Sequence, residues 1–221
     1  MERLEDALAR ARAIDVDELA GAIQAIGFEC TRCGRCCTAE AREPHTATIF
    51  PDEIRAIAER TGVSWEEVAR PMPYGLDEKG DGETLEWALQ TDERGDCRFL
   101  ETTDDGETAC SVYDDRPLIC RTYPFSVSLD QSDGNGPDVV ATEGILQAHS
   151  CPGLDCDTDD AVASALAGTL RVRAIREMEE AIALRDEYRP ARGTSPLVVH
   201  DSEGQKRPDG TFVPEKDGSG E

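Results

Sequence analysis

Lysine is scarce in this sequence of 221 residues and occurs only at Lys79, Lys206 and Lys216. The 23 basic residues are otherwise arginines, and they face 47 acidic residues, which gives a net charge of −24. Such a chain repels the phosphates of nucleic acid, so we exclude nucleic acid as a partner. Mobile ions screen self-repulsion of this size, and the composition therefore indicates a halophilic protein that works at high salt.

Large apolar side chains are also few. Leu, Ile, Val and Phe together number 42, about 19% of the chain. With this net charge, that fraction is typical of disordered proteins. A structural metal can, however, contribute about 10–16 kcal/mol of apparent binding free energy. We therefore expect a small core that bound metal stabilises, and an apo-protein of much lower stability.

Two kinds of apolar segment are missing. The first residues, Met-Glu-Arg-Leu-Glu-Asp-Ala-Leu, are charged and amphipathic and do not resemble the apolar region of a signal peptide. No run of 18 or more apolar residues suggests a membrane span. We expect a cytoplasmic protein without a membrane partner, in which cysteines stay reduced and can bind metal.

Cysteine, in contrast, is abundant, with nine residues. Four of them lie within the eight residues Cys30-Thr-Arg-Cys-Gly-Arg-Cys-Cys. Two thiolates separated by two residues can bind one ion, and Gly34 permits the tight turn that this requires. The adjacent Cys36 and Cys37 leave the backbone in different directions, so we expect them to serve different ions or different edges of one cluster.

The hydrophobic pattern predicts an α+β fold with N-terminal helices and a long C-terminal helix. Helices are expected over 2–12, from the N-cap Asp15 to Ile26, from Pro51, and after a capping box of Ser64 and Glu67. The long helix is expected from about residue 159, capped by Thr158, to Tyr188. Its apolar stripe would comprise Val162, Leu166, Leu170, Met178 and Ile182.

Short strands are expected between these helices. Residues 83–90 alternate like a strand, and the Asp104-Asp105-Gly106 turn predicts a hairpin between the segments around Cys97 and Cys110. Residues 125–129 are expected to pair with residues 139–142. From Pro190 onward, four prolines and five glycines in 32 residues predict a flexible tail.

These elements suggest four regions along the chain. The first is an N-terminal helical segment over 1–27, followed by a cysteine-cluster metal-binding domain over 28–156. A C-terminal helix over 157–190 would pack on this domain. Residues 191–221 would form the flexible tail.

Four separated blocks with their surrounding residues resemble a known family. They are Phe28-Glu-Cys-Thr-Arg-Cys-Gly-Arg-Cys-Cys, Cys97-Arg-Phe-Leu, Cys110-Ser-Val-Tyr-Asp-Asp-Arg-Pro-Leu-Ile-Cys120-Arg-Thr-Tyr-Pro-Phe, and Cys151-Pro-Gly. The chain resembles, over residues 28–153, the YkgJ-type cysteine-cluster family of zinc- or iron-chelating CxxCxxCC proteins, often described as containing an iron–sulfur cluster. The resemblance implies eight metal ligands: Cys30, Cys33, Cys36, Cys37, Cys97, Cys110, Cys120 and Cys151.

Eight thiols suffice for two four-cysteine sites, or for one cluster and one zinc ion. The spacing is not that of a ferredoxin, because Cys37 follows Cys36 directly, and the second paired knuckle of a zinc finger is absent. Zinc and an iron–sulfur cluster both remain open from the sequence. Cys156 is either a spare thiol or an alternative ligand. His149, two residues before Cys151, could ligate or tune a metal or be an ordinary surface histidine, whereas His45 and His200 are expected to have no such role.

Arginines gather beside the cysteines. Four thiolates on a divalent ion leave about two negative charges, and nearby guanidinium groups can donate hydrogen bonds to sulfur and offset that charge. Arg116 and Arg121 could equally pair with Asp114, Asp115 or backbone carbonyls. The arginines expected around the metal are Arg32, Arg35, Arg98, Arg116 and Arg121.

Three functions are consistent with these features. The first is a metal-binding protein whose metal is structural, redox-active or handled as cargo. The second is an enzyme, because a similar cluster occurs in flagellin lysine N-methylases, or an iron–sulfur oxidoreductase component. The third is an adaptor that docks a protein partner on its long C-terminal helix.

Overall fold

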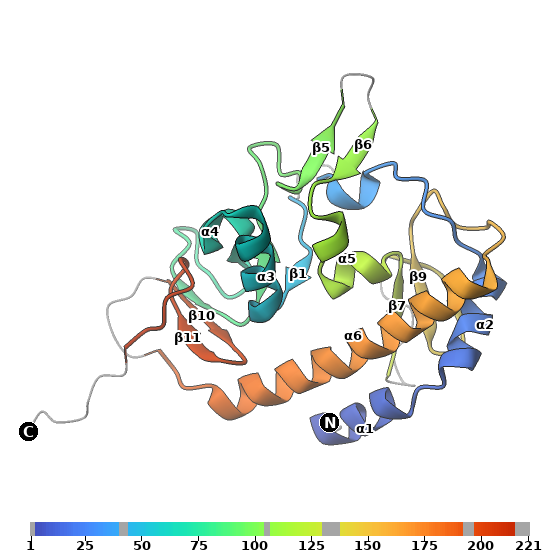
Figure 1. Cartoon of the computed structure of the whole chain (residues 1–221). Coiled ribbons are helices and arrows are strands. Elements are labelled where there is room, and N and C mark those ends of the chain that lie inside the picture. Colours follow the sequence, from blue (N-terminus) through green and yellow to red (C-terminus); the bar gives the residue numbers. More distant parts are fainter. Residues whose placement is uncertain (1–2, 40–43, 104–106, 130–137, 192–196, 215–221) are drawn as a thin grey trace, which may run out of the picture.

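The computed structural model describes residues 3–39, 44–103, 107–129, 138–191 and 197–214, and it confirms the α+β class (Figure 1). A long C-terminal helix crosses the lower part of the view, with the N-terminal helix below it and most of the short strands in small sheets above it. The α-helices are α1 (Leu4–Ala13), α2 (Val16–Ile26), α3 (Pro51–Thr61), α4 (Trp65–Val68), α5 (Leu118–Thr122) and α6 (Asp160–Glu187); the 3₁₀ turns are η1 (Arg35–Cys37) and η2 (Tyr113–Asp115).

The strands form four small sheets. Their orders are β1-β4-β2, β11-β10-β3, β5-β6 and β7-β9-β8, and β10 pairs with β3 in the parallel direction. The strands are β1 (Thr48–Ile49), β2 (Ala69–Pro71), β3 (Gly82–Thr84), β4 (Trp87–Leu89), β5 (Leu100–Thr102), β6 (Thr108–Cys110), β7 (Phe125–Val127), β8 (Val139–Glu143), β9 (Leu146–His149), β10 (Leu197–Asp201) and β11 (Gly204–Lys206).

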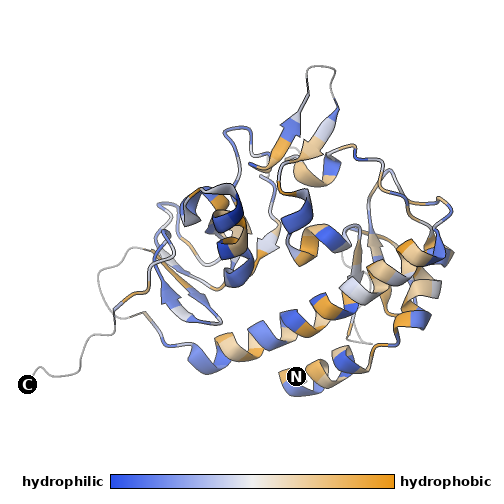
Figure 2. Cartoon of the chain, viewed as in Figure 1, coloured by the Kyte–Doolittle hydropathy of each residue, from blue (hydrophilic) through white to orange (hydrophobic). Residues whose placement is uncertain are grey.

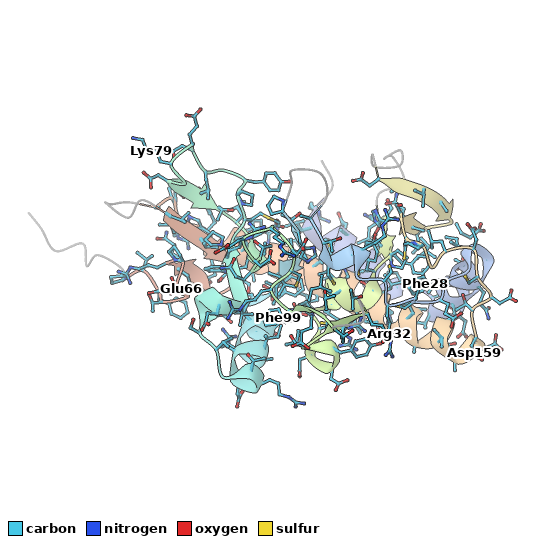
Figure 3. The ribbon with its side chains drawn as sticks, turned by 90° about the horizontal axis from the view of Figure 1, so that it is seen from above. Phe28, Arg32, Glu66, Lys79, Phe99 and Asp159 are labelled. Carbon is cyan, nitrogen blue, oxygen red and sulfur yellow. The ribbon has the colours of Figure 1, made fainter. Side chains whose placement is uncertain are left out.

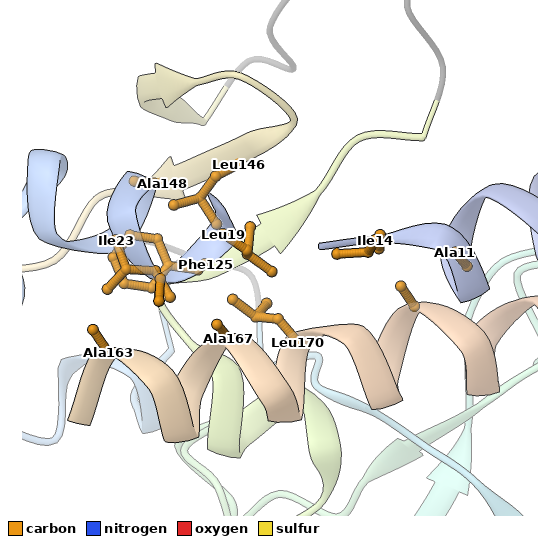
Figure 4. Close-up of a cluster of buried hydrophobic side chains, with 12 residues drawn as sticks. Ala11, Ile14, Leu19, Ile23, Phe125, Leu146, Ala148, Ala163, Ala167 and Leu170 are labelled. Atoms are coloured by element: carbon orange, nitrogen blue, oxygen red, sulfur yellow. The ribbon is translucent and has the colours of Figure 1, made fainter. Parts of the chain in front are cut away.

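The first hydrophobic cluster packs the N-terminal helices α1 and α2 against the C-terminal helix α6 (Figure 4). Leu19 and Ile23 of α2 lie against α6, where Ala163 and Ala167 are fully buried. Small alanine side chains allow two helices to approach closely. The predicted apolar stripe of α6 was therefore only partly right, because Val162 is exposed and the contact surface consists largely of alanines.

Polar and apolar residues are interleaved along the rest of α6 (Figure 2).

The second hydrophobic cluster lies around α3 and β4, and contains Ile54, Ile57 and Trp87. Cys97 is a buried member of this cluster, and three further cysteines pack against it: Cys37, Cys110 and Cys120. The metal-ligand candidates therefore adjoin a hydrophobic core.

Local capping explains where several helices begin. The Asp15 carboxylate accepts hydrogen bonds from the backbone N–H groups of Asp17 and Glu18, as predicted for an N-cap. Glu67 accepts from the backbone N–H of Ser64. Helix α6 differs from the prediction, because its N-cap is Asp159 and the Thr158 hydroxyl instead bonds the backbone of Phe28.

The strand pairing also differs from the prediction in one place. β5 and β6 form the expected hairpin, although its turn lies outside the described residues. β7 and β8 do not pair directly, because β9 lies between them and pairs with both. The expected strand over 83–90 is divided into β3 and β4, which belong to different sheets.

The described residues 197–214 of the C-terminal segment are not the unstructured tail that its composition predicted. Val198, Val199 and His200 of β10 are buried, and Val199 belongs to the second cluster. β10 pairs with β3, more than 100 residues earlier in the sequence. A prediction from local composition cannot detect such a distant partner.

Candidate metal centre

Four segments bring cysteines to one region. η1 holds Cys36 and Cys37, and its preceding residue Gly34 has a left-handed φ of 72°. The backbone N–H of Cys97 donates to the carbonyl of Cys37 at 2.7 Å. Cys110 ends β6, and Cys120 lies on the short helix α5. Backbone contacts therefore join segments that lie about sixty residues apart.

These cysteines line a cavity of about 900 Å³. Phe99 and Arg32, both in its lining, are labelled in Figure 3, where side chains crowd the central part of the molecule. Of the eight predicted ligands, six line this cavity: Cys30, Cys36, Cys37, Cys97, Cys110 and Cys120. Cys33 and Cys151 do not form part of its lining.

A second set of contacts brings the early cysteines beside Cys151. The backbone N–H of Glu29 donates to the carbonyl of Gly153 at 2.9 Å, and Phe28 forms a β-bridge with Leu154. A Cβ atom on Gly153 would lie 2.1 Å from the Glu29 carbonyl oxygen, so only glycine permits this approach. The sequence contained this signal in Cys-Pro-Gly, but its partner could not be identified from the sequence.

The thiols influence one another electrostatically in two groups. Burial, and then negative charge on other cysteines, raises the pKa of Cys97 to about 11, and the same causes raise the pKa of Cys120. For Cys151, burial raises the pKa, and charge on Cys33, Cys36 and Cys30 contributes further. Cys36 is common to both groups, because its charge acts on five thiols: Cys37, Cys97, Cys110, Cys120 and Cys151.

Cys36 and Cys37 form the closest pair of cysteines. Their sulfurs lie 3.7 Å apart, and their hydrogen bond lowers the pKa of Cys36 to about 7 and raises that of Cys37. Two thiolates bound to a tetrahedral ion at about 2.3 Å also have sulfurs about 3.8 Å apart. The expectation that the two residues serve different ions or different edges of one cluster remains a prediction.

The thiols of the described structure are not arranged as a set of ligands around one ion. Among the described residues, which include all nine cysteines, no three His, Cys, Asp or Glu side chains are placed to hold one ion. All nine are free thiols, and the chemistry of the donor set suits zinc or iron. Cys156 lies apart from the cavity lining, and its thiol donates to the Leu154 carbonyl.

The five predicted arginines have different surroundings. Arg98 pairs with Glu67, and Arg121 is exposed; neither lines the cavity. Three arginines do line it: Arg32, Arg35 and Arg116. Arg116 lowers the pKa of Cys36 and Cys110, although larger causes act on both thiols, and its guanidinium stacks on the ring of Tyr113 at 3.9 Å.

Two histidines also line the cavity. His149 Nε2 lies 2.9 Å from the Ser126 hydroxyl, so its ring already has a partner. The Nε2 atom of His45 is buried and has no hydrogen-bond partner in the described part of the chain. His200 lies elsewhere, against Glu83. Sequence reasoning identified His149, two residues before Cys151, as a candidate ligand, but it did not identify His45, which lies outside the cysteine blocks.

Comparison with known proteins supports the metal-binding interpretation. The model of the CxxCxxCC family, described as "Putative zinc- or iron-chelating domain", matches residues 29–152. No curated protein and no solved structure gave a significant match. No helix in the described ranges combines the length and apolar character needed to cross a membrane. The family match covers more than half of the chain, which therefore belongs to the CxxCxxCC family.

Proposed function

We propose that this protein binds zinc, iron or an iron–sulfur cluster through eight cysteines, and that the bound metal stabilises its fold. The observation that carries the proposal is the common cavity lined by cysteines from three separated blocks, which are the early quartet, Cys97, and the block that contains Cys110 and Cys120. Single buried cysteines are ordinary core residues. Six in one lining, within a family described as metal-chelating, favour coordination instead.

We further propose that the eight ligands divide into two sets of four. The inner set adjoins the second hydrophobic cluster and consists of Cys37, Cys97, Cys110 and Cys120. The outer set consists of Cys30, Cys33, Cys36 and Cys151, as the mutual charge interactions of Cys151 suggest. The adjacent Cys36 and Cys37 would join the two sets.

The chain's own residues would prepare these sets. The segment around Gly153 holds the Cys30 loop beside Cys151, and the Cys37–Cys97 backbone bond fixes the inner set. Arg116 favours the thiolate forms. A bound metal would supply cross-links between distant segments or, if it is iron, redox chemistry.

The test is anaerobic purification followed by elemental analysis and a visible absorption spectrum. Single variants should separate the two sets: Cys120→Ser should remove the metal of the inner set and Cys151→Ser that of the outer set. Cys156→Ser is the matched control and should keep the full metal content. A wild-type protein that contains no stoichiometric metal would contradict the proposal.

A specific observation also keeps an enzymatic role in consideration. The cavity is larger than one ion needs and lies within the 300–1,000 Å³ range of small-molecule sites. A structural, closed four-thiolate zinc site would be colourless, whereas an iron–sulfur cluster would absorb visible light and undergo redox reactions. The same spectrum therefore distinguishes these roles. The alternative of an adaptor would require a partner that binds the exposed face of α6.

A further inference from the structure

The charge of the cavity lining is opposite to that of the whole chain. Acidic residues outnumber basic ones by 47 to 23 in the sequence. In the lining, four arginines are present and Asp138 is the one acidic residue among the described residues that form it. The arginines are Arg32, Arg35, Arg116 and Arg173. Positive charge is therefore concentrated in the cavity lining of a protein that is acidic as a whole.

Three of these arginines have no carboxylate partner among the residues that the structure describes. Elsewhere, arginines such as Arg12, Arg55 and Arg176 form salt bridges, and Arg173 pairs with Glu177. In the part of the chain that the structure describes, no carboxylate lies within salt-bridge distance of Arg32, Arg35 or Arg116. Among the described residues, the positive charge of these three side chains is therefore not neutralised by a carboxylate, and it is available to an anionic ligand.

Two of the guanidinium groups lie near the same aromatic ring. Arg116 lies 3.9 Å from the centroid of the Tyr113 ring and Arg32 lies 5.6 Å from the same centroid. Tyr113 itself is 47% exposed. Two cations on one exposed ring repel each other, and an anion that contacts both would relieve that repulsion.

Arg116 also interacts with the cysteines, because its charge lowers the pKa of Cys36, Cys110 and Cys120, although larger causes act on all three thiols. Arg32 and Arg35 line the same cavity.

Other walls of the cavity would suit the remainder of an organic molecule. Phe99, Val112 and Ile119 supply apolar surface. His45 Nε2, buried and without a partner in the described residues, supplies a group that can donate or accept a hydrogen bond. A polar atom of this kind is usually satisfied in a folded protein.

We propose that the cavity binds a small organic anion, whose phosphate or carboxylate group lies against Arg32, Arg35 and Arg116 and whose apolar part contacts Phe99 and Val112. Guanidinium groups bind both kinds of oxyanion through paired, charge-assisted hydrogen bonds. This inference rests on the proposed function in one respect: the ligand would lie beside the bound metal, at a distance where Arg116 interacts with both.

The experiment measures binding of phenyl phosphate, inorganic phosphate and succinate to the metal-loaded protein at constant ionic strength. Wild type should bind phenyl phosphate saturably and more tightly than inorganic phosphate, because only the former contacts the apolar wall. Arg32→Gln and Arg35→Gln together should weaken binding at least about tenfold while the metal content stays unchanged. Arg121→Gln, a neighbouring exposed arginine outside the lining, should bind as wild type does.

Succinate separates the two oxyanions: if it competes with phenyl phosphate the site accepts carboxylates, and if it does not the site selects phosphate. The inference is overturned if loaded wild type shows no saturable binding of any probe, or if Arg121→Gln weakens binding as much as the double variant. Loss of metal from the Arg32, Arg35 variant would assign these arginines to the metal and overturn the inference, while the proposed function would stand. A metal-free wild type would contradict the proposed function.

Discussion

At the scale of single residues, the cysteines alone do not explain the site. Gly153 permits the close approach of the Glu29 carbonyl, and Gly34 turns the chain so that Cys36 and Cys37 face the later cysteines. The ligand types could be predicted from the sequence because thiol spacing is local. The glycines that position these ligands could not be predicted, because a glycine that accommodates a distant backbone segment has no local sequence signature.

Substitution of Gly153 should reduce metal binding by the outer set. Gly153→Ala places a Cβ atom against the Glu29 carbonyl, which must move and take the Cys30 loop away from Cys151. We expect loss of one metal equivalent or one cluster by elemental analysis, with the inner set retained. The control is Gly168→Ala on α6, where nothing lies within 4 Å of the added Cβ and the change should stabilise the helix by about 0.5–1 kcal/mol. Equal metal content in both variants would contradict this role of Gly153.

Metal affinity should fall as the pH falls. The pKa of Cys97 is raised to about 11, and burial also raises the pKa of Cys110 and Cys120, so these thiols are protonated in the apo-protein near neutral pH. Binding must displace those protons, and each one should weaken the affinity about tenfold per unit of decreasing pH. Cys36 has a pKa of about 7, so it is mostly a thiolate above pH 8 and should release few protons when metal binds there.

The measurement is calorimetric titration of apo-protein with zinc in buffers of different ionisation enthalpy. About three to four protons should be released per ion at the inner set. The Cys120→Ser variant should release fewer. An affinity that stays constant between pH 6.5 and 8.5 would show that the ligands are not these buried thiols.

At the scale of elements, capped helices were predictable and long-range sheets were not. Asp15 and the Ser64–Glu67 pair determine helix starts through contacts within three residues, so sequence reasoning found α2 and α4. β9 separates β7 from β8, and β10 pairs with the distant β3, through contacts that no local pattern specifies. Proline and glycine around β10 favoured a tail over a strand.

The C-terminal strands should contribute strongly to stability. The buried Lys206 ammonium lies 2.8 Å from Asp201, which also accepts a hydrogen bond from the Trp87 indole N–H. Asp201→Ala would leave the Trp87 indole without its partner and Lys206 with only one of its two carboxylates, Glu203 at 2.7 Å, so we expect the free energy of unfolding to fall by about 1–3 kcal/mol. Denaturant unfolding of the metal-loaded protein measures this change.

The matched control for Asp201 is the partly exposed ion pair between Arg55 on α3 and Glu203, which lies between β10 and β11. Arg55 is half-exposed and pairs with Glu203, so Arg55→Gln should cost no more than about 1 kcal/mol. If Asp201→Ala lowers the free energy of unfolding as little as Arg55→Gln does, β10 and β11 contribute little to the stability of the fold. The original expectation of a tail without structure would then regain support.

At the scale of the whole molecule, charge and core size act in opposite directions. A net charge of −24 favours expansion, while two modest hydrophobic clusters and the proposed metal sites favour the compact fold. The described salt bridges are mostly exposed and contribute little individually. Stability should therefore depend on ions in solution as well as on bound metal.

Added salt should raise the melting temperature. Ions shorten the range of repulsion between carboxylates to about 3 Å at 1 M salt, whereas the hydrophobic clusters are not weakened. Thermal unfolding in increasing sodium chloride should show a higher Tm at 2 M than at 0.1 M. A Tm that falls over this range would contradict the halophilic prediction.

The most direct test of the central claim is thiol titration of the protein purified without oxygen, before and after removal of metal by a chelator, with elemental analysis of both samples. We predict that eight thiols are protected in the loaded protein, that Cys156 alone reacts, and that all nine react once the metal has been removed. Nine reactive thiols and no stoichiometric metal in a stably folded protein would contradict the claim that these cysteines form a metal centre.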